Sequence, residues 1–89
     1  MKQVISGPAF LKGWKSLLKK RYSQDELDKV VEILSCEGSL PGKYKDHALN
    51  GKYKGYRECH IRDNWLLIYK ITDSEVILFA TGTHDDLFK

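Results

Sequence analysis

The sequence has few cysteines, few prolines and no long hydrophobic run. Its two cysteines, Cys36 and Cys59, form no CxxC pair and have no metal-like spacing relative to the histidines, so neither a disulfide framework nor a metal site is indicated. No stretch of about 18 uncharged apolar residues occurs, and the N-terminus lacks the apolar run of a signal peptide. We therefore expect a cytoplasmic protein that has reduced thiols, needs no metal or cofactor and contacts no membrane.

The length and composition predict one folded domain, residues 1–89. A hydrophobic fraction of 42% beside 30% charged residues is typical of a soluble globular protein and is too apolar for a disordered tail. The net charge of +3 and the pI near 8.9 are a mild excess of positive charge. That excess suits a polyanionic partner such as a nucleic acid without requiring one.

Two helices are predicted in the first half of the chain. After Pro8, apolar residues fall at the spacing of one buried helical stripe, namely Phe10, Leu11, Trp14, Leu17, Leu18 and Tyr22. Lysines cover the outer face of this helix, and both a solvated surface and contacts with phosphate groups are consistent with them. Ser23 and Glu26 form a capping box that starts a second helix, which ends near Cys36. A link of about two residues makes the helices an antiparallel hairpin.

The remaining apolar segments have the pattern of β-strands. A short first strand is predicted at residues 2–6, and three β-rich runs follow the loop that ends at Gly42, at residues 53–61, 65–71 and 75–81. Short polar turns separate the three runs. The predicted fold class is therefore α+β, with the order β-α-α-β-β-β and a helical hairpin packed on one face of an antiparallel sheet.

The predicted strand register brings two of the three histidines together. A turn centred on residues 62–63 places His60 opposite Trp65. A turn centred on residues 73–74 then places Trp65 opposite Gly82, which lies two positions before His84. Two histidines that are far apart in sequence are thus expected at one end of the sheet.

The position of His47 is left open by the sequence. A simple hairpin at residues 50–51 puts this residue roughly 20 Å from His60, whereas bends at Gly51 and Gly55 bring it back. Strand alternation points Glu58 and His60 to the same face of the sheet. A lone histidine on such a strand is more often structural than catalytic, but histidines that converge near an acid and several cations favour a functional site.

A resemblance to a known family is carried by two segments, YKDHALNGKYKGYRECHIRDNWLLIYKI and TGTHDDLF. The chain resembles the YafQ-type toxins of the RelE/ParE superfamily, which are bacterial toxin-antitoxin endoribonucleases, over nearly its whole length. The order of strands and helices predicted above is the order of that RelE-like fold. The resemblance implies cleavage of mRNA in the ribosomal decoding site and neutralisation by a DinJ/RelB-like antitoxin. It implies contact with operator DNA only through the antitoxin complex.

The resemblance also implies the residues of the site. The functional histidines of the family fall on His47, His60 and His84. Three histidines can cover both proton transfers of metal-free RNA cleavage, in which a base takes the proton of the 2′-hydroxyl and an acid protonates the leaving 5′-oxygen. The residues expected to contact the phosphates and bases of the substrate are Lys45, Lys52, Lys54, Arg57, Asp63, Asn64, Trp65 and Phe88.

Two positions depart from the family pattern. Asn64 stands where relatives carry Asp, and Ala80 stands where many carry Arg. Asn64 cannot act as a general base, and Ala80 removes a bidentate phosphate donor, a kind of contact whose loss costs on the order of 10²–10³ in rate. We therefore expect a nuclease weaker than its relatives or arranged differently, or a non-catalytic binding module that keeps the fold and the antitoxin groove. A gyrase-inhibiting toxin of the same superfamily is disfavoured, because that activity requires no acid/base histidines.

Overall fold

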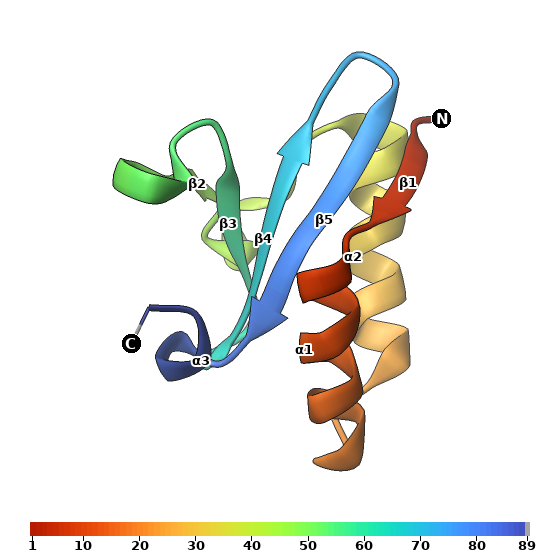
Figure 1. The fold of residues 1–89 in the computed structure, drawn as a ribbon. Helices are drawn as coiled ribbons and strands as arrows, with labels where there is room; N and C mark the ends of the chain where they lie inside the picture. The colour runs from red at the N-terminus through yellow and green to blue at the C-terminus, as the bar shows by residue number, and fades with distance from the viewer. Residues whose placement is uncertain (89) are drawn as a thin grey trace.

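The structure, a computed structural model, describes residues 1–88 and has two layers (Figure 1). A five-stranded sheet forms one layer, and two helices that lie side by side form the other. The elements in chain order are β1 (Gln3–Ser6), α1 (Pro8–Lys19), α2 (Gln24–Glu37), the 3-10 helix η1 (Gly42–Tyr44), β2 (His47–Ala48), the 3-10 helix η2 (Gly51–Tyr53), β3 (Arg57–Arg62), β4 (Trp65–Ile71), β5 (Glu75–Gly82) and α3 (His84–Phe88).

The strand order in the sheet is β1-β5-β4-β3-β2. Neighbours from β2 to β5 pair antiparallel, whereas β1 pairs parallel with β5, so that Gln3 lies opposite Glu75. The predicted α+β class with an antiparallel sheet and a helical hairpin is confirmed, and β1 is the one strand that pairs parallel. Two helices separate β1 from the next strand, so no tight turn fixes its direction, and it adds to the free edge of β5. The short elements β2 and α3 are additions to the predicted order.

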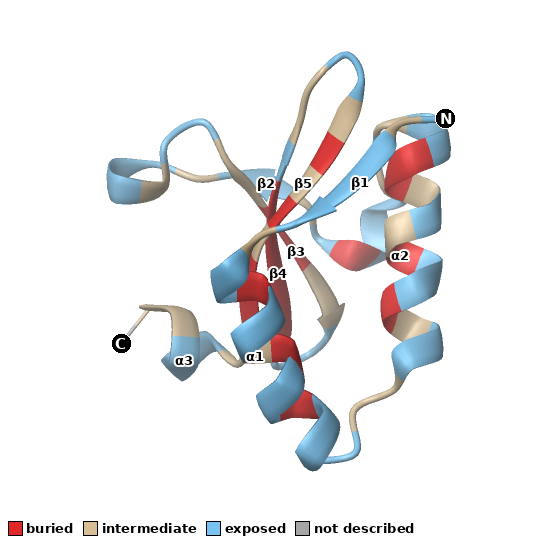
Figure 2. Cartoon of the chain, turned by 45° about the vertical axis from the view of Figure 1, so that its right-hand side comes forward, coloured by how far each residue is buried: buried red, intermediate tan, exposed pale blue. Residues whose placement is uncertain are grey.

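The hydrophobic core lies between the helices and one face of the sheet (Figure 2). β4 is central to it, because Trp65, Leu67 and Tyr69 are all completely buried. These side chains alternate along the strand with Leu66 and Ile68, which point to the other face. The helices supply the opposite side of the core, with Phe10, Trp14, Leu17, Leu27, Val30 and Leu34.

The buried stripe of α1 is narrower than predicted. Leu11 and Leu18 were expected in that stripe, but they are 51% and 45% exposed. The helix packs chiefly on β5, so only the residues that face this strand are covered, namely Phe10, Trp14 and Leu17. Single exposed leucines are ordinary on a protein surface.

Caps define both ends of α2. The backbone N–H of Glu26 donates to the Ser23 hydroxyl at 3.3 Å, as the capping box predicts. The reciprocal contact expected from the Glu26 side chain is wrong, because its carboxylate accepts from Arg62 Nε at 2.6 Å instead. Gly38 ends the helix in the left-handed conformation, with φ of 75°. Within residues 1–88, no helix is both long enough and apolar enough to cross a membrane.

A glycine allows α1 to approach the sheet closely. A Cβ atom at Gly13 would overlap the backbone carbonyl oxygen of Thr81 on β5. This contact sets the position of α1 beside the second half of β5, where β1 no longer pairs.

The face of the sheet away from α1 and α2 is only partly covered. α3 and the loop that contains η2 lie on that side (Figure 1). They contact each other, because the Tyr53 hydroxyl donates to the carbonyl oxygen of Leu87 at 3.4 Å. We refer to this side as the open face.

We predict that Gly13→Ala destabilises the fold. The added methyl group cannot enter the contact with Thr81 unless α1 moves, and overpacking of this kind costs about 1–3 kcal/mol. Urea denaturation measures the loss. Gly42→Ala is the matched control, because no atom lies within 4 Å of the added Cβ, and its effect should stay within about 0.5 kcal/mol. Equal stability of the two variants would contradict the packing described for α1.

Candidate functional site

A bent loop brings His47 beside His60. β2 pairs with β3 so that His47 lies opposite Glu58. The loop between these strands contains η2 and two glycines with positive φ, Gly51 at 69° and Gly55 at 94°. The ring centroids of His47 and His60 are 6.4 Å apart. Of the two geometries that the sequence left open for His47, the bent one is observed.

A buried carboxylate joins the two imidazoles. Glu58 Oε1 lies 3.5 Å from Nε2 of His47 and 3.4 Å from Nε2 of His60. The Glu58 side chain is only 7% exposed, so its partners in place of water are these rings. Glu58 was not among the predicted site residues, although strand alternation placed it on the same face as His60 and two positions away. We refer to His47, Glu58 and His60 as the carboxylate-bridged pair.

Hydrogen bonding distinguishes the two rings of this pair. His47 Nδ1 lies 2.9 Å from the backbone carbonyl oxygen of Lys45. A carbonyl can only accept, so His47 carries a hydrogen on Nδ1, and its Nε2 can also donate to Glu58 only when the ring carries both hydrogens. Within the described residues, His60 Nδ1 has no hydrogen-bond partner, whereas its Nε2 faces Glu58. His60 therefore has one ring nitrogen directed at the carboxylate and the other available to a ligand.

A bulge corrects the predicted register by one residue. His60 pairs with Leu66, and Arg62 pairs with Trp65, because an irregularity lies between His60 and Arg62. Leu66 in turn pairs with Gly82. The expectation that Trp65 lies opposite His60 and Gly82 is therefore wrong, and Leu66 occupies that position. Two strand spacings of about 4.8 Å separate the backbone of His60 from that of Gly82, roughly 10 Å in all.

His84 is held at the start of α3 by two independent contacts. Its backbone N–H donates to Asn64 Oδ1 at 3.1 Å, which ties α3 to the turn before β4. Thr83 and Asp86 form a reciprocal capping box: the Thr83 N–H donates to Asp86 Oδ2 at 3.0 Å, and the Asp86 N–H donates to Thr83 Oγ1 at 3.2 Å. The T-x-x-D spacing in the sequence is the signal for this cap, and it was missed.

Trp65 does not face the open face. It is completely buried, with its ring stacked on Trp14 at a centroid distance of 5.6 Å and its Nε1–H donating to Thr81 Oγ1 at 3.0 Å. The prediction that Trp65 contacts substrate is therefore corrected: the ring belongs to the core. The bulge at His60 explains the difference, because it places Trp65 on the helix side of the sheet.

The predicted phosphate contacts divide into engaged and exposed groups. Arg57 donates to Asp46 from Nε at 3.1 Å and from a terminal nitrogen at 2.9 Å, and this hydrogen bonding raises the pKa of the guanidinium. Asp46 also accepts from the Tyr69 hydroxyl. Arg57 thus has an ion-pair partner, and its predicted contact with phosphate stays a prediction. The exposed members of the predicted set are Lys45, Lys52, Lys54, Asp63 and Asn64.

Aromatic rings line the open face between the histidines and β5. Phe88 lies 5.3 Å from the His84 ring and 5.8 Å from Tyr53, measured between centroids. Tyr53 also contacts Phe79 at 6.0 Å, and Phe79 lies 4.7 Å from Tyr56. Phe88 is partly exposed, so its predicted role in substrate binding stays a prediction. Tyr53 and Phe79 were not predicted to belong to the site.

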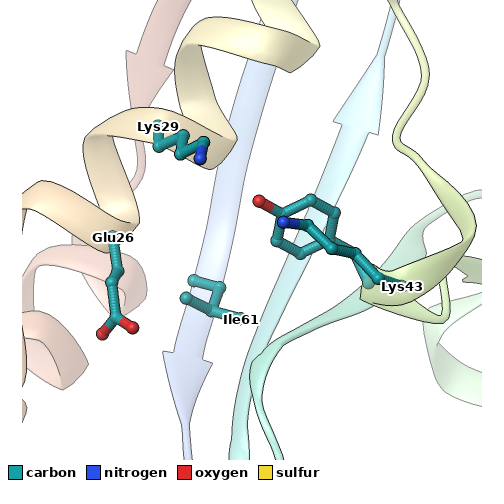
Figure 3. Close-up of a pocket in the computed structure, with 5 residues that line it drawn as sticks. Glu26, Lys29, Lys43 and Ile61 are labelled. Atoms are coloured by element: carbon teal, nitrogen blue, oxygen red, sulfur yellow. The ribbon is translucent and has the colours of Figure 1, made fainter.

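A hollow lies on the helix side of the molecule, away from the histidines. Its volume is about 250 Å³, and Figure 3 shows Glu26 and Lys29 of α2 facing Lys43 and Ile61 across it. None of the three histidines lines it. Among residues 1–88, no three histidine, cysteine or carboxylate side chains are grouped as a metal site requires.

We predict that the anchoring of α3 depends on the ionised Asp86 side chain. The hydrogen bond from the Thr83 backbone lowers the pKa of Asp86, with a smaller contribution from the nearby charge of Lys20. Because the folded-state pKa lies below the unfolded value, the stabilisation is complete above the unfolded-state pKa and is lost as pH falls through the folded-state pKa. The Thr83 amide shift in an NMR titration should follow Asp86.

The Asp86→Asn variant removes that titration, and Asp85→Asn serves as its control because Asp85 takes no part in the cap. A Thr83 amide that titrates identically in wild type and Asp86→Asn would contradict this cap.

Comparisons with known proteins identify the family of the chain. The family model described as "Bacterial toxin of type II toxin-antitoxin system, YafQ" matches residues 2–89. The curated mRNA interferase toxin YafQ of Escherichia coli K12 is 53% identical over 74 residues, which cover 81% of this chain and 80% of that protein.

Solved structures give the same result over the whole chain. A crystal structure of a YafQ mutant from E. coli has a TM-score of 0.92 and 33% identity, with both chains fully covered. YafQ in the crystal structure of the E. coli DinJ-YafQ complex has a TM-score of 0.90 and 34% identity, again with both chains fully covered. The family match and the fold agree, and the chain belongs to the YafQ family of toxins of bacterial type II toxin-antitoxin systems.

Proposed function

We propose that this protein is an mRNA interferase, an endoribonuclease toxin that cleaves messenger RNA by attack of a ribose 2′-hydroxyl on the adjacent phosphate. The single observation that carries the proposal is the carboxylate-bridged pair of imidazoles, whose His60 is joined through Leu66 on β4 to Gly82 on β5, two positions before His84. The curated relative at 53% identity is named as an mRNA interferase, which supports the same activity here.

His60 is the general base of the proposed reaction. Its Nε2 is directed at Glu58, at 3.4 Å, so its Nδ1 is the nitrogen that can take the proton of the 2′-hydroxyl. The carboxylate orients the ring and stabilises the imidazolium that forms, as the acid of a catalytic triad does. His47 holds Glu58 from the other side, at 3.5 Å, and is a positioning residue.

His84 is the general acid. It follows Gly82 by two positions, and the backbone of Gly82 lies two strand spacings, roughly 10 Å, from that of His60. In the proposed reaction the phosphate lies between the two rings. The 2′-oxygen forms a bond to phosphorus, the bond from phosphorus to the 5′-oxygen breaks, and His84 protonates the leaving oxygen. The products are a 2′,3′-cyclic phosphate and a 5′-hydroxyl end.

The two departures from the family pattern carry different weight. Asn64 keeps a positioning function, because its Oδ1 accepts the His84 backbone N–H at 3.1 Å, although without the charge that an aspartate would bring to that contact. Ala80 brings no charge to β5, and the reduced electrostatic stabilisation supports a slower enzyme than relatives that carry arginine there. Lys52 and Lys54 are exposed on the η2 loop and are available to the substrate.

The partners of the proposed toxin follow from its relatives. E. coli YafQ is solved in complex with DinJ, and we propose that a DinJ/RelB-like antitoxin neutralises this chain in the cytoplasm. The substrate is mRNA on the ribosome, and operator DNA is contacted only through the antitoxin complex. No resident metal or cofactor takes part in the proposed proton transfers.

The test is cleavage of a defined messenger in a cell-free bacterial translation system, mapped by primer extension. Wild type should cut within translated codons and leave 5′-hydroxyl ends. Addition of a chelator to purified complexes of the toxin, the ribosome and the messenger should leave the cutting unchanged. His60→Ala and His84→Ala should each lower the rate on the order of 10²–10⁴, as expected for loss of a general base or acid. Lys29→Ala, on the helix side, is the control.

Glu58→Gln separates positioning from simple structural loss. It keeps the shape of the side chain but removes the charge that stabilises the imidazolium, so the pH dependence of kcat should move as well as its value. Folded wild-type protein that cuts no messenger would overturn the nuclease proposal and leave the non-catalytic binding module in its place.

A further inference from the structure

A cavity of about 440 Å³ lies between α1, β5, α3 and the η2 loop. It is separate from the carboxylate-bridged pair, none of whose residues lines it. Its walls include two aromatic rings, one small side chain and three polar side chains, namely Tyr53, Phe79, Ala80, Lys12, Ser16 and Asp86.

Three features of the sequence create this space. β1 pairs with β5 only as far as Leu78, so the following segment of β5 has a free edge. Gly13 lets α1 approach that edge closely and brings Lys12 and Ser16 to it. The alanine at position 80 leaves empty the volume that a larger side chain would take.

The cavity adjoins the proposed catalytic site through α3. Asp86 and Leu87 line it, and they follow His84 on the same short helix, within about one turn. Tyr53, a further wall residue, contacts the Phe88 ring and donates to the Leu87 carbonyl oxygen. We therefore expect the nucleotide next to the bond cleaved between His60 and His84 to reach this cavity.

The charges around the cavity suit a phosphate. Lys12 and Ser16 lie four positions apart on α1, and Lys20, the C-cap residue of this helix, follows four positions later. The one carboxylate in the wall, Asp86, is held by the Thr83 backbone N–H at 3.0 Å and interacts with Lys20. Lys12 has no ion-pair partner among the described residues, so its charge is available to a ligand.

The apolar part of the wall suits a base. Tyr53 and Phe79 supply aromatic surface that every nucleobase can pack against. A cavity that combines such rings with a free lysine matches a nucleotide of a single strand, because a duplex keeps its bases stacked inside.

We propose that this cavity binds the nucleotide next to the cleaved bond, with Lys12 contacting its phosphate and its base seated against Tyr53 and Phe79 above Ala80. The proposal rests on the proposed nuclease function and deepens it, because it adds a binding site for the substrate beside α3. It also gives a physical role to one lysine of the basic face of α1.

The experiment is binding of a fluorescent, uncleavable 2′-O-methyl RNA oligonucleotide, measured by anisotropy over a range of salt concentrations. Lys12→Ala should weaken binding several-fold at low salt and reduce the slope of log K against log salt by about 0.7, the value for one phosphate contact on a single strand. Lys15→Ala, on the same helix but outside the cavity, should change neither quantity as much.

A second variant tests the cavity itself. Ala80→Leu fills the space without altering charge, so it should weaken binding while leaving the salt slope unchanged. Ala80→Arg in the Lys12→Ala background should restore the slope, because it returns a cation to the same cavity. Thermal unfolding of each variant confirms that the fold is retained.

The outcomes separate this proposal from the nuclease proposal. Wild type that cuts mRNA, with RNA binding unaffected by both Lys12→Ala and Ala80→Leu, overturns the nucleotide site and leaves the nuclease standing. Binding that depends on Lys12 and on the cavity, in a protein that cuts nothing, supports the site and overturns the nuclease. Wild type that fails to bind the oligonucleotide at low salt overturns the nucleotide site.

Discussion

The organisation of the open face depends on the buried carboxylate of Glu58. A carboxylate removed from water must be met by hydrogen-bond donors or positive charge, and here two imidazoles meet it within 3.5 Å. That requirement links three levels of the structure. It favours the register that places His47 opposite Glu58, it fixes the orientation of the His60 ring, and it leaves one nitrogen of that ring free for chemistry.

The other half of the proposed site is built differently. Within residues 1–88, the His84 ring has no hydrogen-bond or ion-pair partner; its backbone is positioned by Asn64 and by the capping box of α3. A five-residue helix has little stability of its own, so these few contacts and the packing of Phe88 on Tyr53 hold it in place. One half of the site is therefore organised around a buried carboxylate and the other by backbone contacts, and Tyr53 of the η2 loop contacts the second half.

Much of this arrangement could be predicted from the sequence. Helical periodicity and the capping box at Ser23 predicted the two long helices. The alternating pattern of the later segments predicted the three long strands and the face shared by Glu58 and His60. The family resemblance predicted that the three histidines belong to the functional site. Two features could not be predicted. One bulge after His60 places the Trp65 side chain in the core. The strand β1 pairs with β5 in the parallel direction, because no tight turn constrains it. Neither event leaves a periodic signal.

The most direct measurement of the central claim, that Glu58 prepares His60 as a base, is the tautomeric state of the imidazoles by long-range ¹H–¹⁵N NMR. The account predicts that neutral His60 carries its hydrogen on Nε2, that His47 carries one on Nδ1, and that Glu58→Gln alters the signals of both rings. A neutral His60 with its hydrogen on Nδ1, or rings that do not respond to Glu58→Gln, would contradict it.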